Sequence, residues 1–141
     1  GVARAVEGRW APGAHVLDIG GGTGIVYRLL PPAAREGLVV SDVDPRALKV
    51  AELRGRGGQF RVGTVAQVAG PSEFEAMLSL ELFTALPPER HAALLQAILM
   101  GLKPGGVYIS MYDQPSFPHD LRLGLLRQLV ASNPPADGES V

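Results

Sequence analysis

The sequence predicts a doubly wound α/β domain, in which helices cover both faces of a mainly parallel sheet. Short apolar runs alternate with helical patterns along the chain, as parallel sheets require. A glycine cluster at residues 20–24 follows the first apolar run, and Asp42 ends the second. The chain has 141 residues, 46% of them hydrophobic and 19% charged, which suits one folded domain.

Each expected strand is a short apolar run bounded by turn-forming residues. The strands cover residues 15–19, 38–42, 59–63, 75–81 and 107–112. Helices are expected over residues 24–30, 45–54, 88–102 and 121–130. Asp44 before Pro45 is a strong helix start, since the carboxylate caps free N–H groups and proline fits the first turn. The helix beginning at Pro88 has apolar residues at helical spacing, which predicts one buried face: Leu94, Leu95, Ile98 and Leu102.

Composition excludes several kinds of function. Because the chain has no cysteine, it holds no disulfide, thiolate metal site or cysteine nucleophile, which agrees with a cytoplasmic location. A net charge of −1 gives no reason to expect nucleic acid or a membrane surface as partner. We expect a single domain over residues 1–141, with a tail from about residue 131.

The loop after the first strand carries the strongest signal. Residues 16–24 read Val-Leu-Asp-Ile-Gly-Gly-Gly-Thr-Gly, and glycines allow both a sharp turn and close approach of a ligand. A tight turn without a ligand would use the same residues. Asp42 favours the interpretation as a ligand-binding loop, because a carboxylate about twenty residues after such a loop can accept hydrogen bonds from ribose hydroxyls. Asp44 suits the helix cap, which leaves Asp42 for the ribose.

The glycine spacing separates several kinds of nucleotide site. Gly20, Gly22 and Gly24 alternate with single residues, whereas dinucleotide-binding loops leave two residues before the third glycine and phosphate-binding loops continue with Gly-Lys. Preceded by Asp18, the stretch resembles the first motif of class I S-adenosylmethionine-dependent methyltransferases. Further segments resemble that family's later motifs in the same order: residues 42–45, 79–83 and 102–106.

The resemblance implies a Rossmann-like fold that binds S-adenosylmethionine as methyl donor and releases S-adenosylhomocysteine. It implies direct in-line transfer to an acceptor, for which a small molecule is the default, and it implies no metal. The glycines would line the donor's methionine portion, Asp42 its ribose, and Val43 one face of its adenine. The residues that it places at the donor are Asp18, Gly20, Gly21, Gly22, Thr23, Gly24, Asp42, Val43, Thr64, Val65 and Leu80.

The catalytic residues are less clear than the donor site. Glu81, at the exit of the fourth strand, is the candidate base or substrate contact, with a purely structural carboxylate as an equal alternative. Thr64 stands where many relatives carry an aspartate that accepts from adenine, and Gln67 is a candidate to assist it. His119 could face the pocket, with a solvated histidine as the favoured alternative. Tyr112 and Asp113 are candidates to line the pocket, with a turn cap as the alternative for Asp113, and His91 is expected to pack on its helix. His15 lies at the wrong end of its strand for chemistry.

The end of the chain departs from the family pattern. Complete relatives have two further strands after the fifth, and we expect this chain to lack them, as a fragment would. The fifth strand, with Val107, Ile109 and Met111, would then be an exposed edge that suits a homodimer. Two other function classes remain open. One is a non-catalytic S-adenosylmethionine-binding or scaffold relative. The other is a nicotinamide-dependent oxidoreductase, which Asp42 suits but the glycine spacing disfavours.

Overall fold

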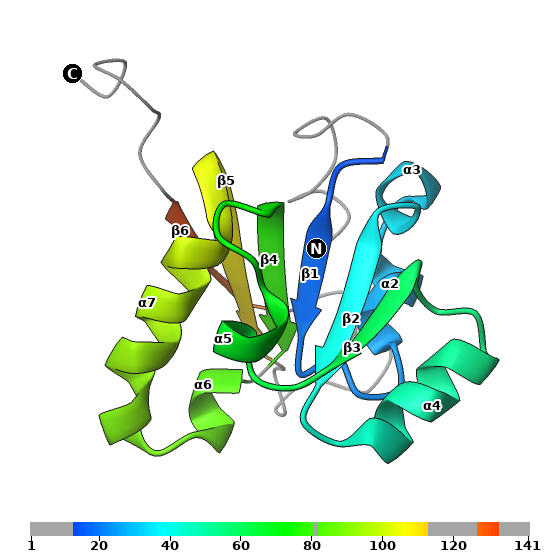
Figure 1. Cartoon of the computed structure of the whole chain (residues 1–141), viewed down its shortest axis with the longest axis horizontal. Coiled ribbons are helices and arrows are strands. Elements are labelled where there is room, and N and C mark those ends of the chain that lie inside the picture. The colour runs from blue at the N-terminus through cyan, green and yellow to red at the C-terminus, as the bar shows by residue number, and fades with distance from the viewer. Residues whose placement is uncertain (1–12, 81, 113–126, 133–141) are drawn as a thin grey trace.

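A six-stranded sheet lies between two layers of helices in the computed structural model, which describes residues 13–80, 82–112 and 127–132 (Figure 1). The strands are β1 (Val16–Ile19), β2 (Leu38–Asp42), β3 (Gln59–Val62), β4 (Phe74–Leu80), β5 (Leu102–Tyr112) and β6 (Arg127–Ser132). The helices are α2 (Ile25–Leu29), α3 (Pro32–Arg35), α4 (Pro45–Leu53), α5 (Val65–Val68), α6 (Leu82–Ala85), the 3₁₀ turn η1 (Pro88–Arg90) and α7 (His91–Gly101).

The strand order is β3-β2-β1-β4-β5-β6, so the direction of winding reverses between β1 and β4. Strands β3 to β5 are all parallel, and Ile19 of β1 pairs with Ser41 of β2 on one side and Ser79 of β4 on the other. Where the winding reverses, the connections leave the strand ends in opposite directions. The crevice formed there is the usual ligand site of such sheets.

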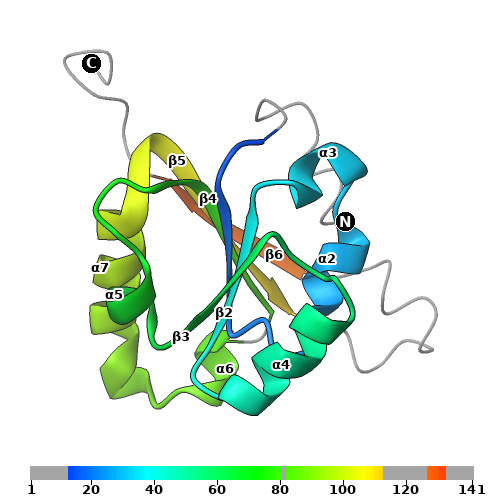
Figure 2. The same ribbon diagram turned by 45° about the vertical axis from the view of Figure 1, so that its right-hand side comes forward.

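Each face of the sheet has its own apolar core. One core joins the sheet to α2 and α4: Val16, Val26, Leu30, Leu38, Val40, Leu48, Ala76, Leu78, Val107 and Ile109. The other joins it to α5 and α7: Leu17, Ile19, Val39, Val65, Val68, Phe74, Met77, Ile98, Leu102 and Tyr108. Figure 2 shows the two helical layers from a second angle, with the sheet between them. These two cores confirm the predicted doubly wound architecture.

Helices α2, α4 and α7 follow the sequence patterns, with differences in detail. Asp44 caps α4 as predicted, since its Oδ1 accepts from the Arg46 backbone N–H at 2.9 Å. On α7, Ile98 is buried as expected, but Leu95 is 37% exposed, so its predicted place in the buried face is wrong. Leu95 lies about 100° around the helix from Leu94, and the cluster is instead completed by Ala97 and Leu99. Three short helices, α3, α5 and α6, were not predicted.

The strand β6 corrects two predictions. We expected a helix over residues 121–130, but residues 127–132 form a strand antiparallel to β5, and residues 121–126 lie outside the described part. The exposed fifth-strand edge is therefore occupied, and the homodimer that depended on it loses its basis. A free edge presents unpaired N–H and C=O groups, and a nearby segment of the same chain satisfies them. Ala131 and Ser132, expected in the tail, belong to this strand. The prediction that the final two strands are lacking is amended accordingly, because one antiparallel strand follows β5.

Strand β5 also begins earlier than predicted. Leu102 pairs with Phe74, and the regular register resumes only where Val107 pairs with Ala76, so the Lys103–Gly106 stretch forms an irregularity within the strand. The predicted turn at these residues is thus absorbed into β5. None of the helices among the described residues is long and apolar enough to cross a membrane.

Candidate functional site

The glycine loop, residues 20–24, leaves the carboxyl end of β1 at the point where the winding reverses. Gly20, Gly22 and Gly24 have φ angles of +64°, +56° and +86°, a region that side chains strongly disfavour. The Gly21 N–H donates to the carbonyl of Ser41 at 2.8 Å, which ties the loop to β2. The sequence therefore uses glycine here because the backbone adopts a left-handed conformation at three of five residues.

Gly21 is required for a different reason, which is space. A Cβ at this position would overlap the Asp18 carboxylate beneath it and would lie 2.7 Å from Cγ1 of Val40. No such contact is tolerated without displacement of the neighbours. The loop consequently lies directly on the side chains of β1 and β2, with its outer surface free of side chains at this residue.

Asp42 links the glycine loop to the turn that follows β2. Its Oδ2 accepts from the Gly22 N–H at 2.9 Å, and its Oδ1 accepts from the Asp44 N–H at 2.9 Å. Each carboxylate oxygen can accept two hydrogen bonds, so capacity remains for ligand hydroxyls. The sequence placed Asp42 at this edge, but it did not reveal that the same carboxylate holds the loop.

Asp18 is a buried carboxylate at the carboxyl end of β1. It is 1% exposed, and its neighbours in the sheet are Val40 and Leu78. Neither carboxylate oxygen has a partner among the described residues. Burial raises the pKa of Asp18 to about 8, and the charge of Asp42 adds to the increase. The neutral form of Asp18 is therefore favoured near pH 7 in the ligand-free chain.

The residues expected to contact the adenine, which form the adenine wall, differ in their exposure. Val43 is 67% exposed beside Asp42, whereas Val65 is 2% exposed and its side chain packs into the core below α5. Thr64 precedes α5, and its N–H donates to Oε1 of Gln67 at 2.9 Å. The oxygen of Gln67 therefore caps α5, and only its amide group would be left to assist Thr64.

The residues near the exit of β4 are only partly described. Leu80, the last residue of β4, is half-buried against the α2 and α4 core. Leu82 was not predicted as a site residue. Its Cδ1 lies 3.8 Å from the point where a Cβ on Gly20 would be, so it flanks the loop. The predicted candidates Glu81, Asp113 and His119, and the side chain of Tyr112, lie outside what the structure describes.

The two remaining histidines take structural positions. His15 lies before β1, at the amino edge of the sheet, where its backbone N–H donates to Glu75 Oε2 at 2.7 Å. His91, at the start of α7, has Nε2 3.0 Å from the carbonyl of Leu86. His15 lies at the end of β1 opposite the glycine loop, and His91 is 67 residues after Gly24 in the sequence. They agree with the expectation that neither histidine takes part in chemistry.

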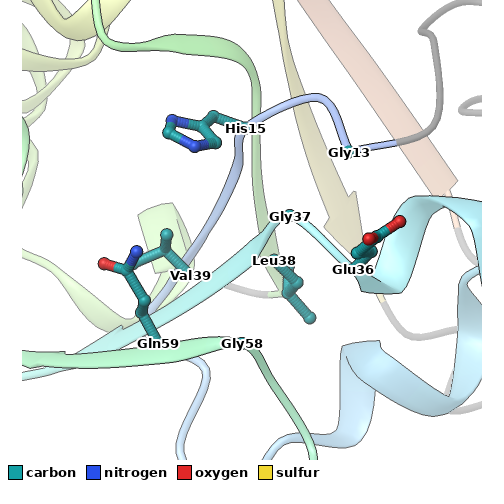
Figure 3. Close-up of a pocket in the computed structure, with 8 residues that line it drawn as sticks. All are labelled: Gly13, His15, Glu36, Gly37, Leu38, Val39, Gly58 and Gln59. Atoms are coloured by element: carbon teal, nitrogen blue, oxygen red, sulfur yellow. The ribbon is translucent and has the colours of Figure 1, made fainter.

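A shallow hollow of about 200 Å³ lies at the opposite edge of the sheet (Figure 3). It is lined by the residues that lead into β1, β2 and β3: Gly13, His15, Glu36, Gly37, Leu38, Val39, Gly58 and Gln59. Ligands of parallel sheets bind beyond the carboxyl ends of the strands, and this hollow is at the amino ends. The glycine loop, with its unsatisfied carboxylate, is therefore the better candidate site.

Comparison with known proteins identifies a family. A family model described as "Methyltransferase domain" matches residues 16–106, which include the glycine loop, Asp42 and the Lys103–Gly106 stretch. The match covers more than half of the chain. Among curated proteins, none matches the sequence.

Solved structures show the same fold. An S-adenosylmethionine-dependent methyltransferase from Mesorhizobium loti is 20% identical, with a TM-score of 0.62 over 81% of this chain and 53% of that one. Phosphoethanolamine N-methyltransferase 2 of Haemonchus contortus, solved with S-adenosylhomocysteine, is 21% identical, with a TM-score of 0.63 over 87% and 30%. A methyltransferase from Methanosarcina mazei is also 21% identical, with a TM-score of 0.63 over 85% and 62%. The chain thus spans less than two thirds of each of these proteins.

Proposed function

Since the chain belongs to the class I S-adenosylmethionine-dependent methyltransferases, we propose that it binds this donor on the glycine loop and methylates a small-molecule acceptor. The observation that carries the proposal is the Asp42 carboxylate, which holds Gly22 and faces the same edge of the sheet. One residue thereby shapes the loop and offers acceptors to a ribose. Net charge of −1 and the absence of cysteine support a small molecule and a cytoplasmic location over nucleic acid or a membrane.

The residues present fit the donor. The surface of the loop at Gly21 has no Cβ, so a methionine portion could lie against the backbone. Val43 offers an exposed apolar surface to one face of an adenine, and the Thr64 hydroxyl could accept from its amino group. The Asp18 carboxyl group lies beneath the loop and can be neutral or negatively charged near pH 7. S-adenosylmethionine is a cation, which the negatively charged form would attract. No metal is needed for any of these contacts.

The chemistry would be a single displacement. The donor supplies an electrophilic methyl group on a sulfonium sulfur. A lone pair of the acceptor forms the new bond to carbon as the carbon–sulfur bond breaks, and the sulfur keeps that electron pair. The protein's part is to hold the two reactants in line, which can lower the barrier without a general base when the acceptor is already nucleophilic. For an acceptor that must lose a proton, Glu81 remains our proposed base.

Thermal unfolding with ligands tests the donor site. S-adenosylmethionine or S-adenosylhomocysteine at about 100 times its dissociation constant should stabilise the fold by ~2.7 kcal/mol, a shift of several degrees. NAD should give no shift. Asp42→Asn should lose most of the ligand shift, because it loses a charged acceptor. The control is Glu75→Gln, which makes the same chemical change at the amino edge and should keep the full shift.

The outcomes separate the function classes. A shift with NAD alone would establish the oxidoreductase alternative. If the shift with both sulfur ligands persists in Asp42→Asn, the proposed site is wrong. Turnover is then measured as S-adenosylhomocysteine formed with a panel of oxygen, nitrogen and carbon acceptors. Binding without product formation on any acceptor would favour the non-catalytic alternative.

A further inference from the structure

We propose that Arg56 is a positioning residue that fixes the second half of the glycine loop and so strengthens donor binding. Arg56 lies in the connection between α4 and β3, 33 residues after Thr23. Its Nη1 donates to the Thr23 carbonyl at 3.2 Å, in a partly buried position. The inference rests on the proposed function, because it concerns the same donor site.

The local sequence places the Arg56 backbone accurately. Helix α4 ends with two hydrogen bonds, from Gly55 N–H to the Glu52 carbonyl and from Arg56 N–H to the Ala51 carbonyl, both at 3.0 Å. This pair of bonds defines a Schellman motif, which needs a left-handed residue after the cap. Gly55 supplies it, with φ of +63°. The motif turns the chain so that the residue after the glycine returns toward the helix.

The stem of Arg56 then packs against the last residue of the glycine loop. The place where a Cβ on Gly24 would lie is 2.6 Å from the Arg56 Cβ and 3.1 Å from its Cδ. Gly24 is buried, so this contact is part of the packed interior. Any residue other than glycine at position 24 would push the arginine away. Two glycines, one in each segment, therefore allow the contact.

Arg56 supplements the contacts that hold the first half of the loop. Gly21 and Gly22 are tied to β2 by the Ser41 carbonyl and the Asp42 carboxylate. The N–H of the peptide between Thr23 and Gly24 donates to the Gly21 carbonyl at 2.9 Å within the loop, and Arg56 holds the carbonyl of that peptide from outside the loop. A loop fixed from both directions loses less conformational entropy when a ligand binds, so its affinity is higher.

Two substitutions separate the parts of this contact. Arg56→Met keeps an unbranched stem against Gly24 but removes the hydrogen bond. Arg56→Lys keeps the charge and one donor. Arg54→Met is the matched control, because it makes the same change two residues earlier at an exposed position. The dissociation constant of S-adenosylhomocysteine is measured for each by titration calorimetry. Amide hydrogen exchange at residues 22–25 is measured in the ligand-free proteins.

We expect Arg56→Met to weaken binding roughly tenfold, the factor that corresponds to one hydrogen bond to a charged group. Its amides at residues 23–25 should exchange faster than in the wild type. Arg56→Lys should recover part of both losses, and Arg54→Met should change neither. An Arg56→Met protein with wild-type affinity and wild-type exchange overturns the inference. So does an equal loss in Arg54→Met, because it would show a general effect of charge.

The same experiment distinguishes this inference from the proposed function. A wild-type protein that binds neither S-adenosylhomocysteine nor S-adenosylmethionine overturns the proposed function. In that case the exchange rates of the free proteins still decide whether Arg56 orders the loop. If Arg56→Met does not fold, Arg56→Gln replaces it, since it keeps the carbons from Cβ to Cδ that lie against Gly24 but lacks the Nη1 that donates to Thr23. Weaker binding and faster exchange at residues 23–25 would then support the inference, and wild-type affinity and exchange would overturn it.

Discussion

The acidic side chains at the two edges of the sheet differ in how fully their oxygens are hydrogen-bonded within the chain. At the amino edge, Glu75 accepts from Lys103 Nζ at 2.6 Å and from the His15 N–H at 2.7 Å, so both of its oxygens are used within the chain. At the carboxyl edge, Asp18 has no partner in the described part of the chain, and Asp42 retains free acceptor capacity. The amino edge is built for stability, whereas the carboxyl edge keeps polar groups that the fold alone does not need.

This difference also shows which signal locates a site. The hollow of about 200 Å³ lies at the amino edge, and the expected donor site is at the other. A hollow among the described residues therefore does not by itself mark the expected donor site. A buried carboxylate without a partner among the described residues lowers stability, and natural chains keep such a feature where function requires it.

The largest expected effects come from one glycine at each edge. Gly37→Ala would drive a Cβ into the Ala14 carbonyl, and Gly21→Ala into the Asp18 carboxylate. We expect Gly37→Ala to lower the free energy of unfolding by about 3 kcal/mol or more, and Gly21→Ala by about 2 kcal/mol, since a side chain yields more easily than backbone. Urea unfolding measures both.

The Gly37→Ala and Gly21→Ala variants also distinguish an effect on stability from an effect on donor binding. Folded Gly37→Ala should keep its affinity for S-adenosylhomocysteine, whereas Gly21→Ala should lose it. Calorimetric titration below the melting temperature checks this contrast. Equal losses of affinity in the two variants would mean that the edges are not functionally distinct.

Asp18 should make stability fall as pH rises. Its folded pKa of about 8 lies above the unfolded value of about 3.9, so between these values the folded state binds more protons than the unfolded state. The free energy of unfolding should decrease across this window by at most about 1.4 kcal/mol per pH unit. Asp18→Asn, which resembles the neutral acid, should remove the decrease. Unfolding of both proteins at pH 5 and pH 7.5 measures it, and parallel pH profiles would contradict the assignment.

Glu75 should act with the opposite sign. Burial raises the pKa of Glu75, but the hydrogen bonds from Lys103 and from backbone N–H groups together lower this pKa by more than burial raises it. The net shift is therefore downward. Its contribution is present above the unfolded pKa and is lost as pH falls through the folded value. Because the pair is partly exposed, we expect Glu75→Gln to cost about 1 kcal/mol at pH 7 and less at pH 3. An undiminished cost at pH 3 would show that charge is not involved.

The smallest effects concern two exposed apolar residues. Val43 is 67% exposed beside Asp42, and Leu53 is 76% exposed at the end of α4. Val43→Ser and Leu53→Ser should each change the free energy of unfolding by less than about 0.5 kcal/mol. Only Val43→Ser should weaken donor binding, by roughly threefold to tenfold, because it removes apolar surface from the adenine. A similar loss in both variants would exclude Val43 as part of the adenine wall.

Part of the site was predictable because its signals are local. Asp44 before Pro45 predicted the start of α4, and the structure confirms its cap. The alternating glycines predicted a turn at the carboxyl end of β1, where the structure has it. In both cases the physical cause lies within a few residues of the signal. Cap preference and backbone freedom are properties that neighbours in sequence express.

Other parts were not predictable because they depend on residues that meet only in the folded chain. Residues 127–132 have no strong local preference, and the unpaired edge of β5 decides that they form a strand. Gln67 was considered for adenine, yet its oxygen is used by Thr64. Leu95 fits a helical stripe, but the sheet leaves it partly exposed.

By itself, the sequence determined the order of the five parallel strands and of helices α2, α4 and α7, the glycine loop and the position of Asp42 at the end of β2. Only the tertiary structure decided that Asp42 holds Gly22, that Arg56 holds Thr23, and that Asp18 is buried without a partner among the residues that the structure describes. The first set follows from hydrophobic periodicity and backbone preferences, which act over a few residues. The second set joins residues 20 and 33 positions apart, whose contacts exist only after the parallel strands have paired and brought their carboxyl ends together.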